Sequence, residues 1–242
     1  MLRYGLIGFP LSHSFSEKYF SDKFEAENTA ACYKNYPVEN LDQLRPLIAE
    51  QQLAGLNVTI PYKEKIIPYL DAIEDTAKLA GAVNCIQIRH GLLKGFNTDI
   101  IGFQQGFLET LPANRNYKAL VLGNGGAAKA VSFCLQQHGI SFYTVTRRHI
   151  PFTIRYQDID ARLLDECKLL INTTPLGMFP NVHERPDLPY HYVTDAHIAF
   201  DLIYNPAQTA FLQACANQKA STKNGLRMLQ IQADESYRIF TQ

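Results

Sequence analysis

The chain has 242 residues, and its 23 Lys and Arg balance its 23 Asp and Glu, so the formal net charge is zero at pH 7. This balance gives no electrostatic attraction to nucleic acid or to a membrane surface. No apolar run is long enough to span a bilayer, and Gly8 and Pro10 break the first residues too early for a signal peptide. Five scattered cysteines without a C-x-x-C pair are typical of a reducing compartment. The composition therefore predicts a cytoplasmic protein with neither a nucleic-acid nor a membrane partner.

The seven histidines give no sign of a metal site. None is paired at i, i+4 spacing, and none has a cysteine or a carboxylate at the spacing of a ligand set. His183, beside Glu184, is expected to be a solvated surface residue, and His13 either contributes to a site or braces its loop. The sequence therefore predicts no bound metal.

Segments of strand and helix type alternate along the first half of the chain, which is typical of parallel sheets covered by helices. His90-Gly91 lies between two short strand segments and predicts a hairpin turn. The expected elements are, in order, strand Leu2–Ile7, helix Ser14–Glu27, strand Cys32–Pro37, helix Leu41–Gln51, strand Leu56–Thr59, helix Lys63–Leu70, strands Val83–Arg89 and Leu92–Phe96, and helix Thr98–Leu111.

A polar segment with a proline, residues 112–118, separates this series from a second one. The second series begins with strand Ala119–Leu122 and continues to about Ala220, with a strand that closes at residues 201–204 and a helix at 207–218. Apolar residues near helical spacing predict a last amphipathic helix, Leu226–Phe240. The fold class expected is α/β, with two open, mainly parallel sheets and a domain boundary between residues 111 and 112.

Three polar clusters follow strands of the first half. Asn57, Thr59 and Lys63 surround the point where Pro61 forces the chain out of a strand, because proline cannot continue a central strand. The segments Asn97-Thr-Asp99 and Ser12-His-Ser-Phe-Ser16 follow two other strands. Open α/β sheets place their ligands at the carboxyl ends of strands. The three clusters therefore predict one polar site.

A glycine-rich turn opens the second half. Gly123, Gly125 and Gly126 stand between a strand and a helix, where the backbone can approach a pyrophosphate and the helix N-terminus offers free N–H groups. The alternative is a tight turn without a ligand. After the next strand, Phe142–Thr146, come Arg147 and Arg148 with no acid nearby, a pattern that suits the 2′-phosphate of NADP better than the 2′-hydroxyl of NAD. Two solvated loop arginines are the alternative at this position.

Seven motifs occur in an order that resembles the shikimate dehydrogenase family. Four lie in the first half: H-S-x-S, N-V-T-x-P-x-K, A-G-A-V-N and N-T-D. The others are the glycine turn, Asn172-Thr-Thr-Pro-Leu-Gly-Met178, and Asp201-Leu-Ile-Tyr-Asn-Pro206, and the likeness continues through Gly225–Gln232. The resemblance implies a substrate-binding and catalytic domain at 1–111, to which 223–242 returns, and a Rossmann-like NADP-binding domain at 112–222. It implies reversible reduction of 3-dehydroshikimate to shikimate, with NADP as cofactor, in aromatic amino-acid biosynthesis.

The resemblance also implies roles for individual residues. Lys63 and Asp99 match the catalytic pair, for which a plain ion pair is the structural alternative. Ser14, Ser16 and Tyr204 match the hydroxyls that bind the substrate carboxylate, and Ser14 or Ser16 could instead cap a helix. The residues matched to the ring hydroxyls are Asn57, Thr59, Asn84 and Gln232. The residues matched to the cofactor are Gly123, Asn124, Gly125, Gly126, Ala127, Thr146, Arg147, Arg148, Leu202 and Gly225.

The chain departs from the family pattern at several points. Asn124 replaces a common alanine, which is tolerable because asparagine enters left-handed conformations readily. Arg227 replaces a common glycine, and Thr146 and Arg148 replace two residues of a common Asn-Arg-Thr. Two other functions stay open: an NAD-dependent quinate/shikimate dehydrogenase and a non-catalytic dinucleotide-binding regulator. Intact Lys63 and Asp99 argue against the regulator, and the sequence leaves monomer or homodimer undecided.

Overall fold

The computed structural model describes residues 1–11, 15–113 and 116–242. The chain forms two compact units: unit 1 is Met1–Ile101 with Ile231–Gln242, and unit 2 is Gly102–Gln230. The division falls inside two helices, α4 (Thr98–Gly106) and α8 (Leu226–Thr241), whereas the sequence analysis places it in the polar segment 112–118. The boundaries between the units therefore lie within helices, and the predicted boundary lies several residues further along the chain, in a polar linker.

Unit 1 is built around a mixed sheet. Its strands are β1 (Leu2–Gly8), β2 (Ala31–Pro37), β3 (Gly55–Val58), β4 (Ala72–Ile73), β5 (Cys85–Arg89) and β6 (Leu92–Phe96). Its helices are α1 (Phe15–Ala26), α2 (Leu44–Gln51) and α3 (Asp75–Ala80), with the start of α4 and the second half of α8. In the described residues the strand order is β2-β1-β3-β5-β6-β4, in which β1 runs parallel to β2 and β3, while β5 runs antiparallel to β3 and β6.

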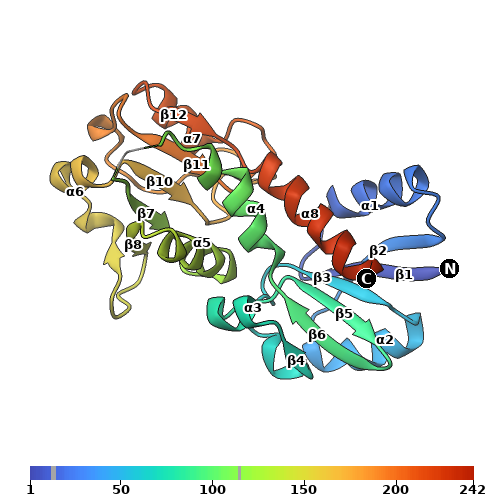
Figure 1. Ribbon diagram of the computed structural model, residues 1–242. Helices are drawn as coiled ribbons and strands as arrows, with labels where there is room; N and C mark the ends of the chain where they lie inside the picture. Colours follow the sequence, from blue (N-terminus) through green and yellow to red (C-terminus); the bar gives the residue numbers. More distant parts are fainter. Residues whose placement is uncertain (12–14, 114–115) are drawn as a thin grey trace. The chain divides into compact units, whose positions relative to one another are not determined.

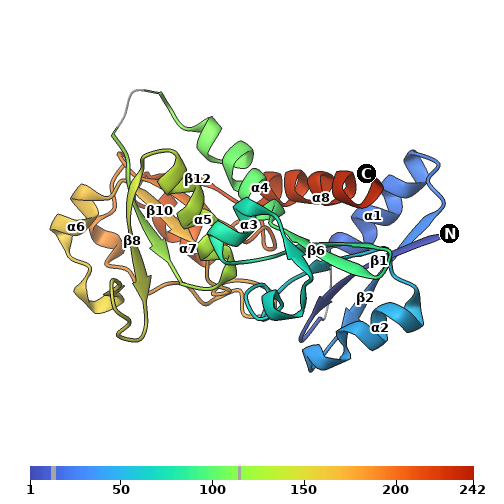
Figure 2. The same ribbon diagram turned by 60° about the horizontal axis from the view of Figure 1, so that its bottom comes forward.

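Alternation along β1 gives this sheet two apolar faces. Tyr4 and Leu6 pack with residues of α1, such as Phe20, and of α8, such as Phe240. Ile7 belongs to the opposite cluster, which includes Leu44 of α2. Figures 1 and 2 accordingly show α1 and α8 on one face of the sheet and α2 on the other. The sheet interior is thereby covered on both faces, and polar groups are left to the strand ends.

Unit 2 contains an all-parallel sheet in its described residues. The strands are β7 (Lys118–Leu122), β8 (Ser141–Thr146), β9 (Ile154–Arg155), β10 (Leu169–Asn172), β11 (Ile198–Asp201) and β12 (Ser221–Lys223), in the order β12-β11-β10-β7-β8-β9. The helices are α5 (Gly126–Gln137), α6 (Ala161–Glu166) and α7 (Ala210–Ala216), with the rest of α4 and the start of α8. Side chains from α6 and α7 join one core cluster with Leu120 and Leu170. Phe107 stacks on Phe200 with ring centroids 4.3 Å apart.

The predicted α/β class is confirmed, with exceptions in detail. The hairpin at His90-Gly91 is present: both residues have positive φ, and β5 and β6 pair antiparallel around them. The predicted helix Lys63–Leu70 is wrong, because turns occupy most of it and only a 3₁₀ turn, Ile67–Tyr69, forms around Pro68. A proline has no N–H for an intrahelical bond, so it limits the helix there. No helix in the ranges the structure describes has both the length and the apolar character for crossing a bilayer.

Candidate functional site

The sheet of unit 1 gathers the predicted polar residues at one edge. Strand β3 ends just before Thr59, and β6 ends just before Asn97. Strand β5 is antiparallel to both, so its beginning, after Asn84, lies at the same edge. Asn57 faces Cys85 in the register, one residue from Asn84. The topology therefore places three segments with amide, hydroxyl and charged side chains together.

Lys63 and Asp99 form an ion pair at this edge. The Lys63 Nζ donates to Asp99 Oδ2 at 2.5 Å. The side chains are 16% and 8% exposed, so the pair is largely withdrawn from water but still reachable. Lys63 lies in the turn after β3, and Asp99 in the first turn of α4, where the helix dipole favours a carboxylate. A cation donor beside an acceptor is a group that can hold and move a proton.

Asn84 fixes the orientation of Asp99. Its Oδ1 accepts from the Thr98 backbone N–H at 2.7 Å, and this assigns the amide, because a backbone N–H can only donate. Its Nδ2 donates to Asp99 Oδ1 at 3.0 Å. Both oxygens of Asp99 are therefore held, one by Lys63 and one by Asn84. The amide that the sequence analysis matched to a substrate hydroxyl also orients the catalytic candidate.

Asn57 is engaged by two hydroxyls that the sequence analysis did not single out. Tyr33 donates from its hydroxyl to Asn57 Oδ1 at 2.8 Å. Asn57 Nδ2 donates to Ser236 Oγ of α8 at 2.9 Å and to the Asn84 carbonyl at 3.3 Å. All of these groups are buried, and Ser236 also lies 3.1 Å from Thr98 Oγ1. Ser236 stands one helical turn after Gln232, and that spacing is the signal which could have revealed it.

The remaining predicted substrate residues of unit 1 are distributed around this network. Gln232 Oε1 accepts from Thr98 Oγ1 at 3.3 Å. Ser16, in the first turn of α1, hydrogen-bonds the hydroxyl of Tyr33. Thr59 is half-buried just past β3. Ser14 lies outside the described residues.

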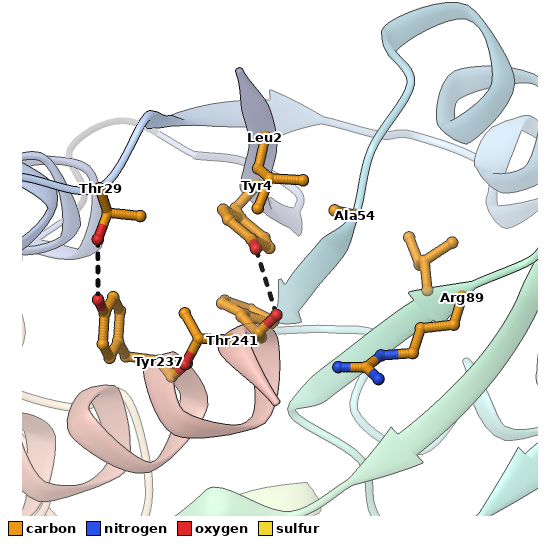
Figure 3. Close-up of a pocket in the computed structure, with 9 residues that line it drawn as sticks. Leu2, Tyr4, Thr29, Ala54, Arg89, Tyr237 and Thr241 are labelled. Atoms are coloured by element: carbon orange, nitrogen blue, oxygen red, sulfur yellow. Dashed lines mark hydrogen bonds between the residues drawn. The ribbon is translucent and has the colours of Figure 1, made fainter.

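A pocket of about 520 Å³ opens at the opposite edge of the same sheet (Figure 3). Leu2 and Tyr4 lie at the beginning of β1, Ala54 precedes β3, and Arg89 ends the antiparallel strand β5. Figure 3 shows the Tyr4 hydroxyl directed at the end of α8, where it donates to the Phe240 carbonyl at 3.2 Å. The pocket is therefore at the amino ends of the parallel strands, whereas ligands of open α/β sheets bind at the carboxyl ends. We therefore do not take this pocket as the candidate catalytic site.

The glycine turn of unit 2 is shaped for close approach of a ligand. Gly123 has φ +110°, and a Cβ there would lie 2.7 Å from Thr173 Oγ1, so a side chain is excluded. A Cβ at Gly125 would meet nothing within 4 Å, which leaves the backbone open. Gly125 is the N-cap residue of α5 and provides no side-chain cap, so the first N–H groups of that helix are available to an anion. Asn124 is expected from the sequence to tolerate a left-handed conformation, but it does not adopt one, because its φ is not positive.

Thr146 organises the segment that carries the two arginines. Its buried Oγ1 donates to the Arg148 carbonyl at 2.7 Å and lies 3.0 Å from Thr153 Oγ1. Arg147 and Arg148 are exposed at the end of β8, and no ion pair of either with a described residue is found. The guanidinium groups thus keep their charge for a ligand, and the turn that presents them is fixed from inside.

Leu202 and Gly225 are brought together. Gly225 donates its N–H to the Ile203 carbonyl at 3.1 Å, and a Cβ at Gly225 would lie 2.0 Å from the Leu202 carbonyl oxygen. Only glycine therefore fits beside Leu202. Tyr204, two residues further, is half-buried in the same segment after β11. Ala127 is half-buried in the first turn of α5. The predicted residues thus form two groups, one at the strand ends of each unit.

Comparisons with known proteins identify the family of this chain. Residues 6–86 match the family model of the shikimate dehydrogenase substrate binding domain. The shikimate dehydrogenase (NADP(+)) of Clostridium beijerinckii is 39% identical over an alignment of 246 positions, gaps included. The alignment covers 98% of this chain and 91% of the relative.

Solved structures of shikimate dehydrogenases are similar to this chain over nearly its whole length. Shikimate dehydrogenase 1 of Peptoclostridium difficile has a TM-score of 0.87 and 37% identity, covering 100% of this chain and 92% of that one. The shikimate 5-dehydrogenase of Thermus thermophilus, solved with NADP(H) and shikimate, has a TM-score of 0.87 and 29% identity, covering 100% and 94%. With a curated relative at 39% identity along nearly its whole length, the chain belongs to the shikimate dehydrogenase family.

Proposed function

We propose that this chain interconverts 3-dehydroshikimate and shikimate with NADP, a step of aromatic amino-acid biosynthesis. The observation that carries the proposal is the Lys63–Asp99 pair, 2.5 Å apart and held by Asn84 at the strand edge of unit 1. A family member that kept the fold as a regulator would have no need of a proton donor fixed in this way.

The reaction needs a hydride and a proton at the two ends of one carbonyl bond. NADPH, when bound, supplies the hydride. As the carbonyl carbon receives it, the carbonyl electron pair moves onto oxygen, and Lys63 Nζ donates the proton that makes the hydroxyl. In the reverse direction Lys63 takes that proton back, which makes it the general acid and base. Asp99 holds Lys63 in line, and Asn84 holds Asp99.

Recognition of shikimate requires donors and acceptors more than charge, since the substrate carries one carboxylate and three hydroxyls. We assign the ring hydroxyls to Thr59, Asn84 and Gln232, and the carboxylate to Ser14, Ser16 and Tyr204. Asn57 contributes mainly by bracing, because both of its amide hydrogens are already used by Ser236 and Asn84. One lone pair of its Oδ1 stays available for a substrate hydroxyl.

The cofactor residues fit NADP by shape and charge. The turn Gly123–Gly126 with Ala127 offers open backbone and helix N–H groups for the pyrophosphate. Arg147, with Arg148 beside it, would pair with the 2′-phosphate, and Thr146 fixes their turn. Leu202 and Gly225 are assigned to the nicotinamide side.

The proposed location of the enzyme is the cytoplasm. None of the five cysteines, all of which lie in the described ranges, forms a disulfide, which suits the reducing cytoplasm. Assembly as a monomer or a homodimer is to be decided by light scattering of the purified protein.

The decisive experiment is an assay of four combinations, with shikimate or quinate as substrate and NADP or NAD as cofactor. We expect reduction of NADP with shikimate to be the fastest. A Lys63→Ala preparation from the same host sets the background of contaminating enzyme. Preference for quinate and NAD would instead favour the quinate/shikimate dehydrogenase, and absence of turnover in all four would favour the regulator.

A further inference from the structure

A buried carboxylate lies among the strand ends of unit 2. Asp201, the last residue of β11, is fully buried. Its Oδ2 accepts from Thr209 Oγ1 at 2.6 Å, and its Oδ1 accepts from Asn172 Nδ2 at 3.0 Å and from the Ile203 backbone N–H at 3.1 Å. Asn172 Nδ2 and the Ile203 N–H can only donate, so two of the three hydrogen bonds require an acceptor at position 201.

No basic side chain in the described ranges forms an ion pair with Asp201, and burial raises the pKa of its carboxyl to about 6. A buried carboxylate that is hydrogen-bonded but lacks a cation carries a large desolvation penalty, which a merely structural connection between a strand and a helix does not require. A neutral acceptor could bond Asn172 and the Ile203 N–H with a smaller desolvation penalty. The cost suggests a task beyond holding the core together.

The bonds of Asp201 lead to the loops that carry the candidate cofactor residues. The Ile203 N–H bond shapes the turn that contains Leu202, and Gly225 packs against that turn. On the neighbouring strand, Asn172 Oδ1 accepts from the Thr174 backbone N–H at 3.0 Å and from Thr174 Oγ1 at 2.7 Å.

The next contact reaches the glycine turn. Between Asn172 and Thr174 stands Thr173, whose Oγ1 donates to the Leu122 carbonyl at 2.7 Å and faces Gly123 closely. Strand ends β7, β10 and β11 are thus connected through one acidic side chain.

We propose that Asp201 is a positioning residue of the NADP site: its carboxylate, through Asn172 and the Ile203 N–H, sets the loops after β10 and β11 in the geometry that the cofactor requires. The inference rests on the proposed function, since it takes those loops to be the cofactor loops. Asp201 itself touches neither substrate nor cofactor in this account.

The test is Asp201→Leu, which keeps the approximate size of the side chain but offers no acceptor to Asn172, Ile203 or Thr209. We expect the dissociation constant of NADP⁺, measured by calorimetry without substrate, to rise about 10- to 100-fold, which corresponds to about 1.4–2.8 kcal/mol of binding free energy. The KM for NADP should rise in parallel. The KM for shikimate should rise less, because Tyr204 alone among its proposed ligands stands on these loops.

A matched control separates positioning from stability. Asp160 caps α6 in the same unit by accepting from the Leu163 N–H at 2.8 Å. Asp160→Leu, which offers the Leu163 N–H no acceptor, should lower the melting temperature and leave NADP⁺ binding unchanged. If Asp201→Leu also lowers only the melting temperature, with NADP⁺ affinity within twofold of wild type, the inference is overturned.

A second pair of variants decides the question if Asp201→Leu does not fold. Thr209→Val removes, without changing charge, the hydroxyl that donates to Asp201 and accepts from the Leu212 N–H at the start of α7, and Thr209→Ser restores both bonds. We expect several-fold weaker NADP⁺ binding in the first and recovery in the second, while equal affinity in both would reject the inference. Because binding is measured without turnover, wild type that binds NADP⁺ but does not oxidise shikimate would reject the proposed activity alone.

Discussion

The Lys63–Asp99 pair lies among neutral amides and hydroxyls. An exposed pair such as Lys18–Asp22 is open to solvent and contributes little to stability. The Lys63–Asp99 pair is largely withdrawn from water, and desolvation opposes its formation. Asn84 offsets part of that cost by donating to Asp99. At the residue scale, such a pair is better explained by proton transfer than by stability.

Replacing Lys63 by alanine tests that explanation. Loss of a general acid–base group should lower kcat about 10²- to 10⁴-fold. NADP⁺ affinity should be preserved, because the candidate cofactor residues are all in unit 2. Asp99→Asn should also slow turnover, and the double variant should be little worse than the poorer single one, since groups acting as a unit are not additive. Near-normal kcat with only a raised KM for shikimate would reduce Lys63 to a binding residue.

Arg147 offers a second test at this scale. If its guanidinium holds the 2′-phosphate, Arg147→Ala loses a charge-assisted hydrogen bond worth roughly 1.5–3 kcal/mol, or about 10- to 150-fold in the KM for NADP. The KM for NAD should be nearly unchanged, because NAD lacks the phosphate. Steady-state kinetics with both cofactors measure this. Equal losses for NADP and NAD would show that Arg147 does not recognise the phosphate, and Arg148→Ala shows whether the second arginine shares the role.

At the scale of elements, helix α8 supports the substrate edge through one buried hydroxyl. Ser236 Oγ accepts from Asn57 Nδ2 of β3 at 2.9 Å and lies 3.1 Å from Thr98 Oγ1 of α4. One side chain therefore connects α8 to two other elements that carry candidate site residues. The apolar residues of α8, such as Ile239 and Phe240, provide the packing that holds it there.

Ser236→Ala should weaken this connection. Asn57 would keep a buried N–H with one partner fewer, and such a loss costs about 1–3 kcal/mol. We expect a lower free energy of unfolding in urea and a higher KM for shikimate, with NADP⁺ affinity unchanged. The control is Thr241→Ala on the same helix, whose exposed hydroxyl bonds only to carbonyls of α8. If the two variants behave alike, Ser236 does not support the site.

At the scale of the whole molecule, a buried histidine makes stability depend on pH. The Thr194 N–H donates to His197 Nδ1 at 2.9 Å, and Nε2 lies 2.8 Å from the Leu164 carbonyl, so His197 is the neutral Nε2–H tautomer. Burial lowers the pKa of His197 below its usual 6.5, with the nearby Lys168 acting in the same direction and Asp165 against it.

The sign follows from proton linkage. Below pH 6.5 the unfolded chain binds a proton at this histidine before the folded one does, so stability is present above 6.5 and is lost as pH falls through the folded pKa. The stability advantage of wild type over His197→Gln should therefore shrink between about pH 7 and 5, in urea titrations. Between about pH 7.5 and 8.5 it should stay constant. An advantage that grows in acid would contradict the assignment.

Much of the architecture was predictable from the sequence because long strands and helices leave a clear period in apolar residues. The helix predicted at Lys63–Leu70 failed because the local pattern ignored Pro68, and strands of two or three residues, such as β4 and β12, are too short to show a period. Motifs led to Lys63, Asp99 and Asn84. They did not lead to Tyr33 or Asp201 as supports, because the bonding partner of a side chain depends on tertiary contacts between distant segments.

The discontinuous composition of unit 1 also bears on how the protein is made. Residues 231–242 belong to unit 1 but follow all of unit 2 in the chain. At about 5–20 residues per second, synthesis of the intervening segment takes several seconds or more. During that time the face of β1 that carries Tyr4 and Leu6 lacks its cover from Ile239 and Phe240. The nascent first unit therefore exposes an apolar surface until late in translation, and during that time it is a target for chaperones.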